Sequence, residues 1–244
     1  MPISFSGNGL LLDIEGTTSP IAFVYEVMFP YARRELDAYL ETHWNDDATR
    51  NACEAIARDA GAKSLEAWCG KDSAKEKRAR VAGEVRRLMD GDIKATGLKE
   101  LQGLIWKEGF ESGEMRARVY DDVVPALQGW CEAGRDIRIY SSGSVAAQKL
   151  FFGHSEAGDL LHFFKGYYDT KTGPKKEAGS YEKIAADFEM KSEDILFLSD
   201  SADELNAARE AGMATGLCVR PGNPPAPDGH GHPALTSFEQ VKLA

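Results

Sequence analysis

The chain has 244 residues, of which 43% are hydrophobic and 28% charged, a composition typical of a folded globular protein. Its length indicates one full domain with a substantial insertion, or two small domains. The formal net charge of −10 argues against a broad nucleic-acid surface, because such surfaces are basic. A small phosphorylated ligand is not excluded, since a few local cations or a metal would be enough to bind it.

The first predicted element is a strand over residues 9–14, the short apolar run GLLLDI that ends with an acidic and an apolar residue. Between residues 22 and 118 the sequence contains no convincing strand. Four segments there carry apolar residues at the spacing of amphipathic helices: residues 31–44, 45–61, 73–91 and 96–110. We therefore predict an all-helical domain over residues 22–118, inserted after the first strand of a core made of residues 1–21 and 119–244.

Three further apolar runs of strand length follow the insertion, at residues 135–142, 193–200 and 215–220. Helical patterns at residues 146–153 and 201–212 separate them, and the second stops at Gly212, a typical residue after a helix end. Short apolar runs alternating with helices predict a doubly wound, Rossmann-like α/β core with a parallel sheet. The Pro- and Gly-rich residues 221–233 predict an exposed loop before a last short helix.

No segment approaches the roughly 18 apolar residues that a membrane helix needs, and the N-terminus lacks the pattern of a signal peptide. The cysteines are scattered without a CxxC pair, which favours neither a zinc ribbon nor a disulfide framework. They are Cys53, Cys69, Cys131 and Cys218. We expect them to be reduced, in a cytoplasmic protein with no membrane or nucleic-acid partner.

Polar residues gather at the ends of the predicted strands or in the turns that follow, which is the edge where ligands bind in a parallel α/β sheet. They are Asp13 and Glu15, Ser141 and Ser142, Lys175, and Asp200 with Asp203 and Glu204 on the next helix turn. Asp13 and Glu15 would point the same way in an extended chain. Taken singly, each residue is more typical of a turn, a helix cap or a solvated surface. Their shared edge is what favours a site.

Together these residues are typical of phosphoryl transfer. A carboxylate can attack phosphorus and form an aspartyl-phosphate, and a second carboxylate can protonate the leaving oxygen. Asp13 and Asp200 would repel each other unless a cation joined them, and Mg²⁺ suits such a place. A serine hydroxyl and a lysine can hold phosphoryl oxygens.

This set resembles the haloacid-dehalogenase-like superfamily of Mg²⁺-dependent phosphatases. That superfamily reads DxDx(T/V) where residues 13–17 read DIEGT, and the glutamate indicates a subgroup. The chain is similar to the enolase-phosphatases of methionine salvage from about residue 10 to residue 223. The similarity rests on LLLDIEGTTSPIAFVYEVMFPYA, IYSSGSVAAQKLFFGHSEAGDL, YYDTKTGPKKEAGSYEKIA and ILFLSDSADELNAAREAG.

The resemblance implies a core of the haloacid-dehalogenase type with a helical cap, a monomer, and one Mg²⁺ per subunit. It implies enolisation of 2,3-diketo-5-methylthiopentyl-1-phosphate, followed by loss of phosphate to give 1,2-dihydroxy-3-keto-5-methylthiopentene. By position, Asp13 is the nucleophile and a metal ligand, and Glu15 is the acid/base and reaches the metal through its backbone carbonyl. Ser141 and Ser142 bind phosphate or substrate, Lys175 steadies the phosphoryl group, and Asp200 completes the metal site.

Other features leave choices open. Candidate side chains for the apolar end of the substrate are Phe23, Tyr25, Phe29 and Trp106. His43 and His154 are candidate bases for the enolisation, and His230 and His232 are expected to be solvated. Alternatives within the superfamily are a phosphatase for another small sugar phosphate or nucleotide, and a dehalogenase. Outside it, a signalling receiver domain is disfavoured by the position of the acid pair, and dinucleotide binding by glycines that precede the first strand.

Overall fold

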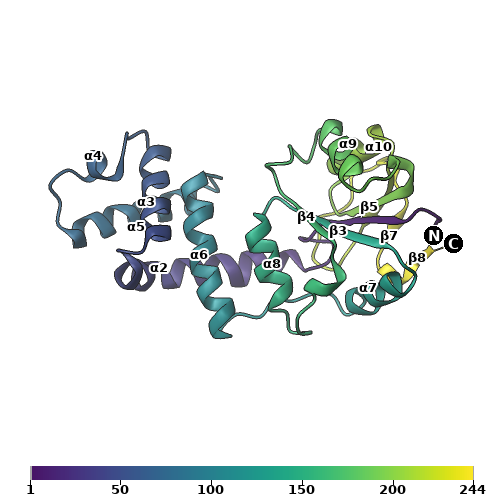
Figure 1. Ribbon diagram of the computed structural model, residues 1–244, viewed down its shortest axis with the longest axis horizontal. Coiled ribbons are helices and arrows are strands. Elements are labelled where there is room, and N and C mark those ends of the chain that lie inside the picture. The colour runs from purple at the N-terminus through teal and green to yellow at the C-terminus, as the bar shows by residue number, and fades with distance from the viewer. Residues whose placement is uncertain (1, 244) are drawn as a thin grey trace. The chain divides into compact units, whose positions relative to one another are not determined.

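The computed structural model describes residues 2–243, which fall into two compact units (Figure 1). One unit contains the residues up to Val24 together with those from Arg116 onward, and the other is Tyr25–Met115. The sequence-based boundaries, 22 and 118, each differ from those of the second unit by three residues. Each unit is described by itself below.

The first unit is built on a six-stranded sheet in the order β4-β3-β2-β5-β6-β7, with all neighbours parallel. Its strands are β2 (Gly9–Leu12), β3 (Asp136–Tyr140), β4 (Gly166–Tyr168), β5 (Ile195–Ser199), β6 (Ala214–Cys218) and β7 (Ala234–Leu235). Every residue of β2 and β5 is buried, as in a parallel sheet covered on both faces.

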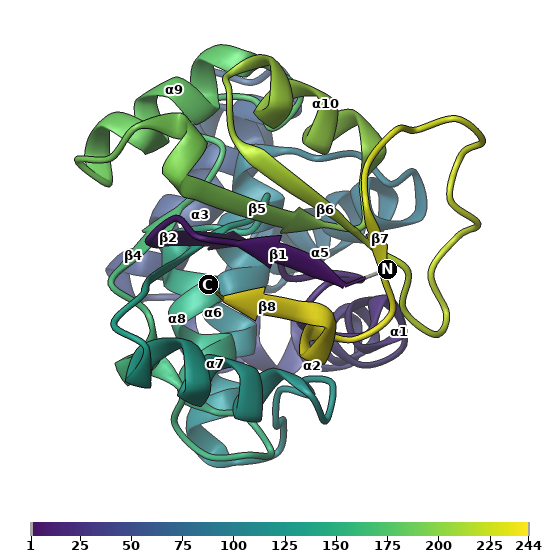
Figure 2. The ribbon, with the colours of Figure 1, turned by 90° about the vertical axis from the view of Figure 1, so that its right-hand side faces the viewer.

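Helices cover both faces of this sheet. Figure 2 shows α9 (Ala178–Asp187) and α10 (Ala202–Glu210) on one face, with α7 (Val123–Glu132) and α8 (Val145–Gly153) on the other. The predicted doubly wound α/β core is therefore confirmed. Short helical turns complete the unit: α1 (Ile21–Phe23), η2 (Leu161–Phe163), η3 (Ser192–Asp194) and η4 (Phe238–Gln240).

Both ends of the chain contribute structure that the sequence did not predict. Strand β1 (Ile3–Phe5) pairs in parallel with β8 (Val241–Leu243), which forms a separate two-stranded sheet (Figure 2). The insertion therefore follows the second strand of the chain. The predicted last helix is a single 3₁₀ turn, η4, from which the chain continues directly into β8.

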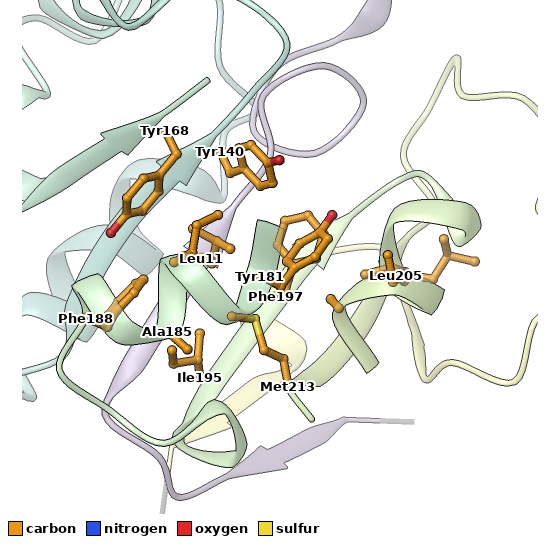
Figure 3. Close-up of a cluster of buried hydrophobic side chains, with 14 residues drawn as sticks. Leu11, Tyr140, Tyr168, Tyr181, Ala185, Phe188, Ile195, Phe197, Leu205 and Met213 are labelled. Carbon is orange, nitrogen blue, oxygen red and sulfur yellow. The ribbon is translucent and has the colours of Figure 1, made fainter. Parts of the chain in front are cut away.

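A cluster of buried side chains joins the sheet to α9 and α10 (Figure 3). Leu11 of β2 and Phe197 of β5 contribute to it from the sheet, and Tyr181 and Leu205 from the helices; all four are fully buried. Burial of each leucine or phenylalanine side chain in the cluster stabilises the fold by about 1.5–3 kcal/mol. The cluster holds the helices firmly on the strands whose ends carry the predicted site.

Every secondary-structure element in the described second unit is helical, with turns and short loops between the helices. The π-helical turn η1 (Val24–Met28) leads into α2 (Phe29–His43), α3 (Asp47–Asp59), α4 (Leu65–Cys69), α5 (Ala74–Asp90) and α6 (Thr96–Ser112). All four predicted helical segments are present. Local chemistry sets their bounds: Ser73 and Glu76 form a capping box that begins α5.

Two further expectations concern the whole chain. No helix in the described part of the chain is both long and apolar enough to cross a membrane. All four cysteines are free. Burial raises the pKa of Cys53 and of Cys218 to about 12, so both are neutral thiols at ordinary pH.

Candidate active site

Asp13 directly follows β2, and its side chain is buried. Its amide N–H donates to a carbonyl of β5 at 3.0 Å, which continues the sheet pairing by one residue. The backbone then turns at once: the amides of residues 17–19 all donate to the carbonyl of Ile14, and Gly16 adopts a φ of +68°. The chain is not extended over residues 13–15, so the strand argument that placed Asp13 and Glu15 on one side does not apply.

Lys175 reaches Asp13 from the loop between β4 and α9. Its Nζ lies 2.7 Å from Asp13 Oδ1 and 2.6 Å from Glu204 Oε2. Two tyrosines hold this loop in place. Tyr181 OH donates to Lys175 O at 2.6 Å, and Tyr140 OH donates to Gly173 O at 2.9 Å. Burial would lower the pKa of Lys175, but the charges of Asp13 and Glu204 outweigh it and raise that pKa. Lys175 is thus a fixed positive charge beside Asp13.

Glu204 is a member of this cluster to which sequence reasoning assigned no role. Its Oε2 accepts from Ser199 Oγ at 3.1 Å as well as pairing with Lys175. Burial raises the pKa of Glu204, and the charge of Asp13 adds to the effect. The neighbouring Asp203 is exposed and pairs with Lys176 at the surface. The available sequence signal was the place of Glu204 in the first turn of the helix that follows β5.

Asp200 lies at the end of β5 and faces the loop after Asp13. A β-carbon placed on Gly16 would collide with Asp200 Oδ2, so this close approach requires glycine. Burial raises the pKa of Asp200 to about 7, and the charge of Asp13 acts in the same direction while Lys175 opposes it. The site therefore holds two carboxylates whose ionised forms disfavour each other.

The oxygen atoms gathered here fit a small hard cation. Asp13 and Asp200 supply two carboxylates, and Mg²⁺ in proteins is typically bound by one or two carboxylates together with waters and phosphate oxygens. The carbonyl of Glu15, the third predicted ligand, belongs to the turn beside them. Within residues 2–243 no three or more His, Cys, Asp or Glu side chains are grouped as a metal cage. Burial and the charge of Asp13 disfavour the ionised form of Asp200, and a bound cation would favour that form again.

Ser141 and Ser142 follow β3, the neighbour of β2 in the sheet. Ser141 is buried and its Oγ accepts from the amide of Gly143 at 3.3 Å, whereas Ser142 is exposed. Gln148 of α8 donates from Nε2 to the carbonyl of Gly143 and to the last carbonyl of β4, both at 2.8 Å. The serine loop is therefore fixed between β3, β4 and the beginning of α8.

The aromatic candidates for the substrate's apolar end belong to different units. Phe23 is buried in the α/β unit, with its ring 5.8 Å from that of Phe151, as a core residue would be. Tyr25, Phe29 and Trp106 belong to the helical unit, where the Phe29 ring lies 5.5 Å from Tyr25 and 6.1 Å from Trp106. Tyr25 is 56% exposed. We call these last three residues the aromatic strip.

The histidines have diverse surroundings. His154 ends α8, and its Nδ1 lies 3.0 Å from a backbone carbonyl of that helix. His43 lies between two carboxylates of the helical unit. The expectation of solvated histidines in the tail is wrong for His232, which is buried and bonds through Nδ1 to Thr215 at 2.8 Å.

Comparison with known proteins identifies the family. A family model of haloacid dehalogenase-like hydrolases matches residues 8–212. "Enolase-phosphatase E1" of Synechococcus elongatus is 46% identical over 91% of the chain and 93% of its own length, and that of Aquifex aeolicus is 43% identical over 96% and 98%. The chain belongs to the enolase-phosphatase family of haloacid dehalogenase-like hydrolases.

The crystal structure of the UTR4 protein of Saccharomyces cerevisiae supports the same family fold. It is 35% identical, with a TM-score of 0.78 over 96% of this chain and 99% of that one. Family membership excludes the receiver-domain and dinucleotide-binding alternatives. The matched residues include Asp13, Lys175, Asp200 and Glu204.

Proposed function

We propose that the chain is an acireductone synthase of L-methionine salvage. It converts 2,3-diketo-5-methylthiopentyl-1-phosphate to 1,2-dihydroxy-3-keto-5-methylthiopentene and phosphate, by enolisation and then dephosphorylation. The observation that carries this proposal is the buried contact of Lys175 with Asp13 beside Asp200, at the end of the central strands of an enolase-phosphatase family member.

Asp13 is the nucleophile in this proposal. One oxygen of its carboxylate attacks phosphorus, the bond from phosphorus to the substrate oxygen breaks, and an aspartyl-phosphate forms. Lys175 holds the carboxylate at 2.7 Å, so the attacking group is oriented before the substrate binds. Its positive charge also offsets the negative charge that develops on the phosphoryl oxygens.

Glu15 is assigned the acid/base role. As a carboxylic acid it gives a proton to the leaving oxygen, and as a carboxylate it then accepts one from the water that hydrolyses the aspartyl-phosphate. Glutamate has one methylene more than the aspartate usual at this position of the superfamily. We propose that the added reach also serves proton transfer during enolisation.

The remaining polar residues bind the phosphate and a cation. Ser141 and Ser142 are assigned to the phosphoryl oxygens, at the strand end next to the one that carries Asp13. Asp13, Asp200 and the carbonyl of Glu15 are assigned to one Mg²⁺ per subunit. The ion, when bound, neutralises charge on the phosphoryl oxygens and on the two carboxylates.

The helical unit is assigned the role of a cap that excludes water from the reactive intermediates. Its aromatic strip offers an apolar surface for the methylthio end of the substrate. We further propose that the enzyme works as a cytoplasmic monomer. The alternative function is a phosphatase of the same superfamily for another small sugar phosphate or nucleotide.

The deciding experiment measures phosphate release and enediol absorbance together, with and without Mg²⁺, for the wild type and for Asp13→Asn. We expect both products to form only with Mg²⁺ and to be lost in the variant. Phosphate without enediol would refute the substrate assignment but retain the phosphatase chemistry. If neither product forms, a panel of sugar phosphates and nucleotides would be assayed as substrates, to test the alternative function.

A further inference from the structure

Asn223 lies in the loop after β6, beyond the residues that the family model matches. The loop turns back on itself, because the backbone N–H of Asn223 donates to Arg220 O at 3.1 Å and Gly222 adopts a φ of +86°. This turn directs the Asn223 side chain toward the loop that follows Asp13. Nothing in the spacing of the sequence motifs indicated this approach.

The amide nitrogen of Asn223 joins two elements of the site. Nδ2 donates to Gly16 O at 2.9 Å and to Cys218 O at 3.1 Å. Two carbonyl partners define which end of the amide is the nitrogen, since only the nitrogen can donate. In the sheet, β5 lies between β2 and β6, so Asn223 spans the strand end from which Asp200 projects.

The other end of the same amide is buried without a partner. Among the described residues, Oδ1 has no hydrogen-bond donor and is shielded from solvent. A β-carbon placed on Gly16 would lie 3.0 Å from this oxygen and would collide with Asp200 Oδ2. The two oxygens therefore flank the same small space, and a buried acceptor with no donor is costly unless an ion or water meets it.

We propose that Asn223 is a positioning residue of the cation site. Nδ2 holds the Glu15–Gly16 turn in place, and Oδ1 accepts a hydrogen bond from a water in the cation's shell beside Asp200. This inference rests on the proposed function, because it requires Mg²⁺ at Asp13 and Asp200. It adds a residue from a loop to which the sequence motifs assign no part of the site.

The test is calorimetric titration of Mg²⁺ into the wild type, Asn223→Ala and Asn206→Ala. Asn206 is the matched control, an exposed asparagine of α10 that bonds to Arg209 and His232. We expect Mg²⁺ affinity to fall by about tenfold or more in Asn223→Ala, the effect typical of outer-shell residues, and to stay unchanged in the control. Phosphate release should then recover at higher Mg²⁺ concentration, which a general loss of structure would not produce.

Several outcomes would overturn the inference. If Asn223→Ala binds Mg²⁺ as tightly as the control, Asn223 has no role toward the cation, although the proposed function stands. If the wild type binds no Mg²⁺, the result contradicts both this inference and the proposed function. Should Asn223→Ala fail to fold, Asn223→Ser decides: a single hydroxyl cannot replace both ends of the amide, so we expect weaker Mg²⁺ binding than in the wild type, and wild-type affinity contradicts the inference.

Discussion

Glu204 shares the Lys175 ammonium with Asp13, at 2.6 and 2.7 Å respectively. Glu204→Gln removes the second negative charge and frees Lys175 to shift. We expect kcat/KM for phosphate release to fall by about 10²-fold, because a displacement near 1 Å can have this effect in a catalytic site. Stability should fall by about 1–3 kcal/mol, since the buried Lys175 ammonium keeps only a neutral amide oxygen where it had a charged acceptor. Steady-state kinetics and urea unfolding measure the two effects.

The adjacent residue provides the control for that variant. Asp203 is exposed and pairs with Lys176 outside the buried cluster. Asp203→Asn should change stability by no more than about 0.5 kcal/mol and leave kcat/KM at the wild-type value. Equal losses in both variants would mean that the effect belongs to the start of α10 and not to Lys175.

The residues that the sequence predicted and those it missed differ in how they reach the site. Asp13 and Asp200 come directly after apolar strands, so the strand pattern alone places them at the sheet edge. Glu204, which the sequence placed near this edge without a role, reaches the cluster through a helix turn, and Asn223, which the sequence missed, reaches it through a loop that folds back. The direction of such side chains depends on tertiary packing, which spacing along the chain does not encode.

The same reasoning separates the elements that were predicted from those that were not. Strands β2, β3 and β5 lie inside buried apolar runs, and the four long helices of the second unit show clear periodicity. Strands β4 and β7 have three and two residues, too few to show any pattern. Strands β1 and β8 depend on pairing between the two ends of the chain, which no local signal reveals.

Helix α8 is fixed to the serine loop by one buried side chain, Gln148. Gln148→Met keeps the volume but removes the side-chain donor from the carbonyls of Gly143 and Tyr168, of which Tyr168 O still accepts from the Ser141 amide at 3.1 Å. We expect a loss of about 1–3 kcal/mol in stability, the cost of an unmet buried acceptor. Inorganic phosphate should also become a weaker competitive inhibitor, because the loop that carries Ser141 loosens. Inhibition constants for phosphate, measured over a series of substrate concentrations, test this.

A matched substitution separates the loop from general packing. Gln102 is a buried glutamine of α6 in the helical unit. Gln102→Met should leave phosphate inhibition unchanged, whatever it does to stability. If Gln148→Met lowers stability while phosphate inhibits as in the wild type, the serine loop does not depend on α8.

At the scale of the whole molecule, the Pro- and Gly-rich residues 221–233 form the mostly exposed loop that the sequence predicted, but two of its side chains bond to the folded unit. Its N-terminal part carries Asn223, which is bonded to the loop after β2. Further along, His232 is buried and contacts both Thr215 of β6 and Asn206 of α10. These bonds tie the loop to the α/β unit, and the chain then forms β7, the strand at the β6 edge of the sheet.

Burial of His232 makes the stability of this arrangement dependent on pH. Burial lowers its pKa from 6.5 to about 4, with contributions from the charges of Arg209 and His230. Below pH 6.5 the unfolded chain binds a proton at this position that the folded chain binds only near pH 4. The free energy of unfolding therefore falls as pH decreases through this window, by about 2 kcal/mol between pH 7 and pH 5 from this residue.

Urea unfolding of the wild type and of His232→Gln at pH 7 and pH 5 measures this contribution. The variant has no group that titrates at this position, so its stability should fall less between the two pH values, by about 2 kcal/mol. The exposed His162 supplies the control, and His162→Gln should keep the wild-type pH dependence. An equal pH dependence in the wild type and His232→Gln would show that the tail releases this histidine to solvent before the chain unfolds, because only a histidine kept neutral by the folded state can destabilise that state in acid.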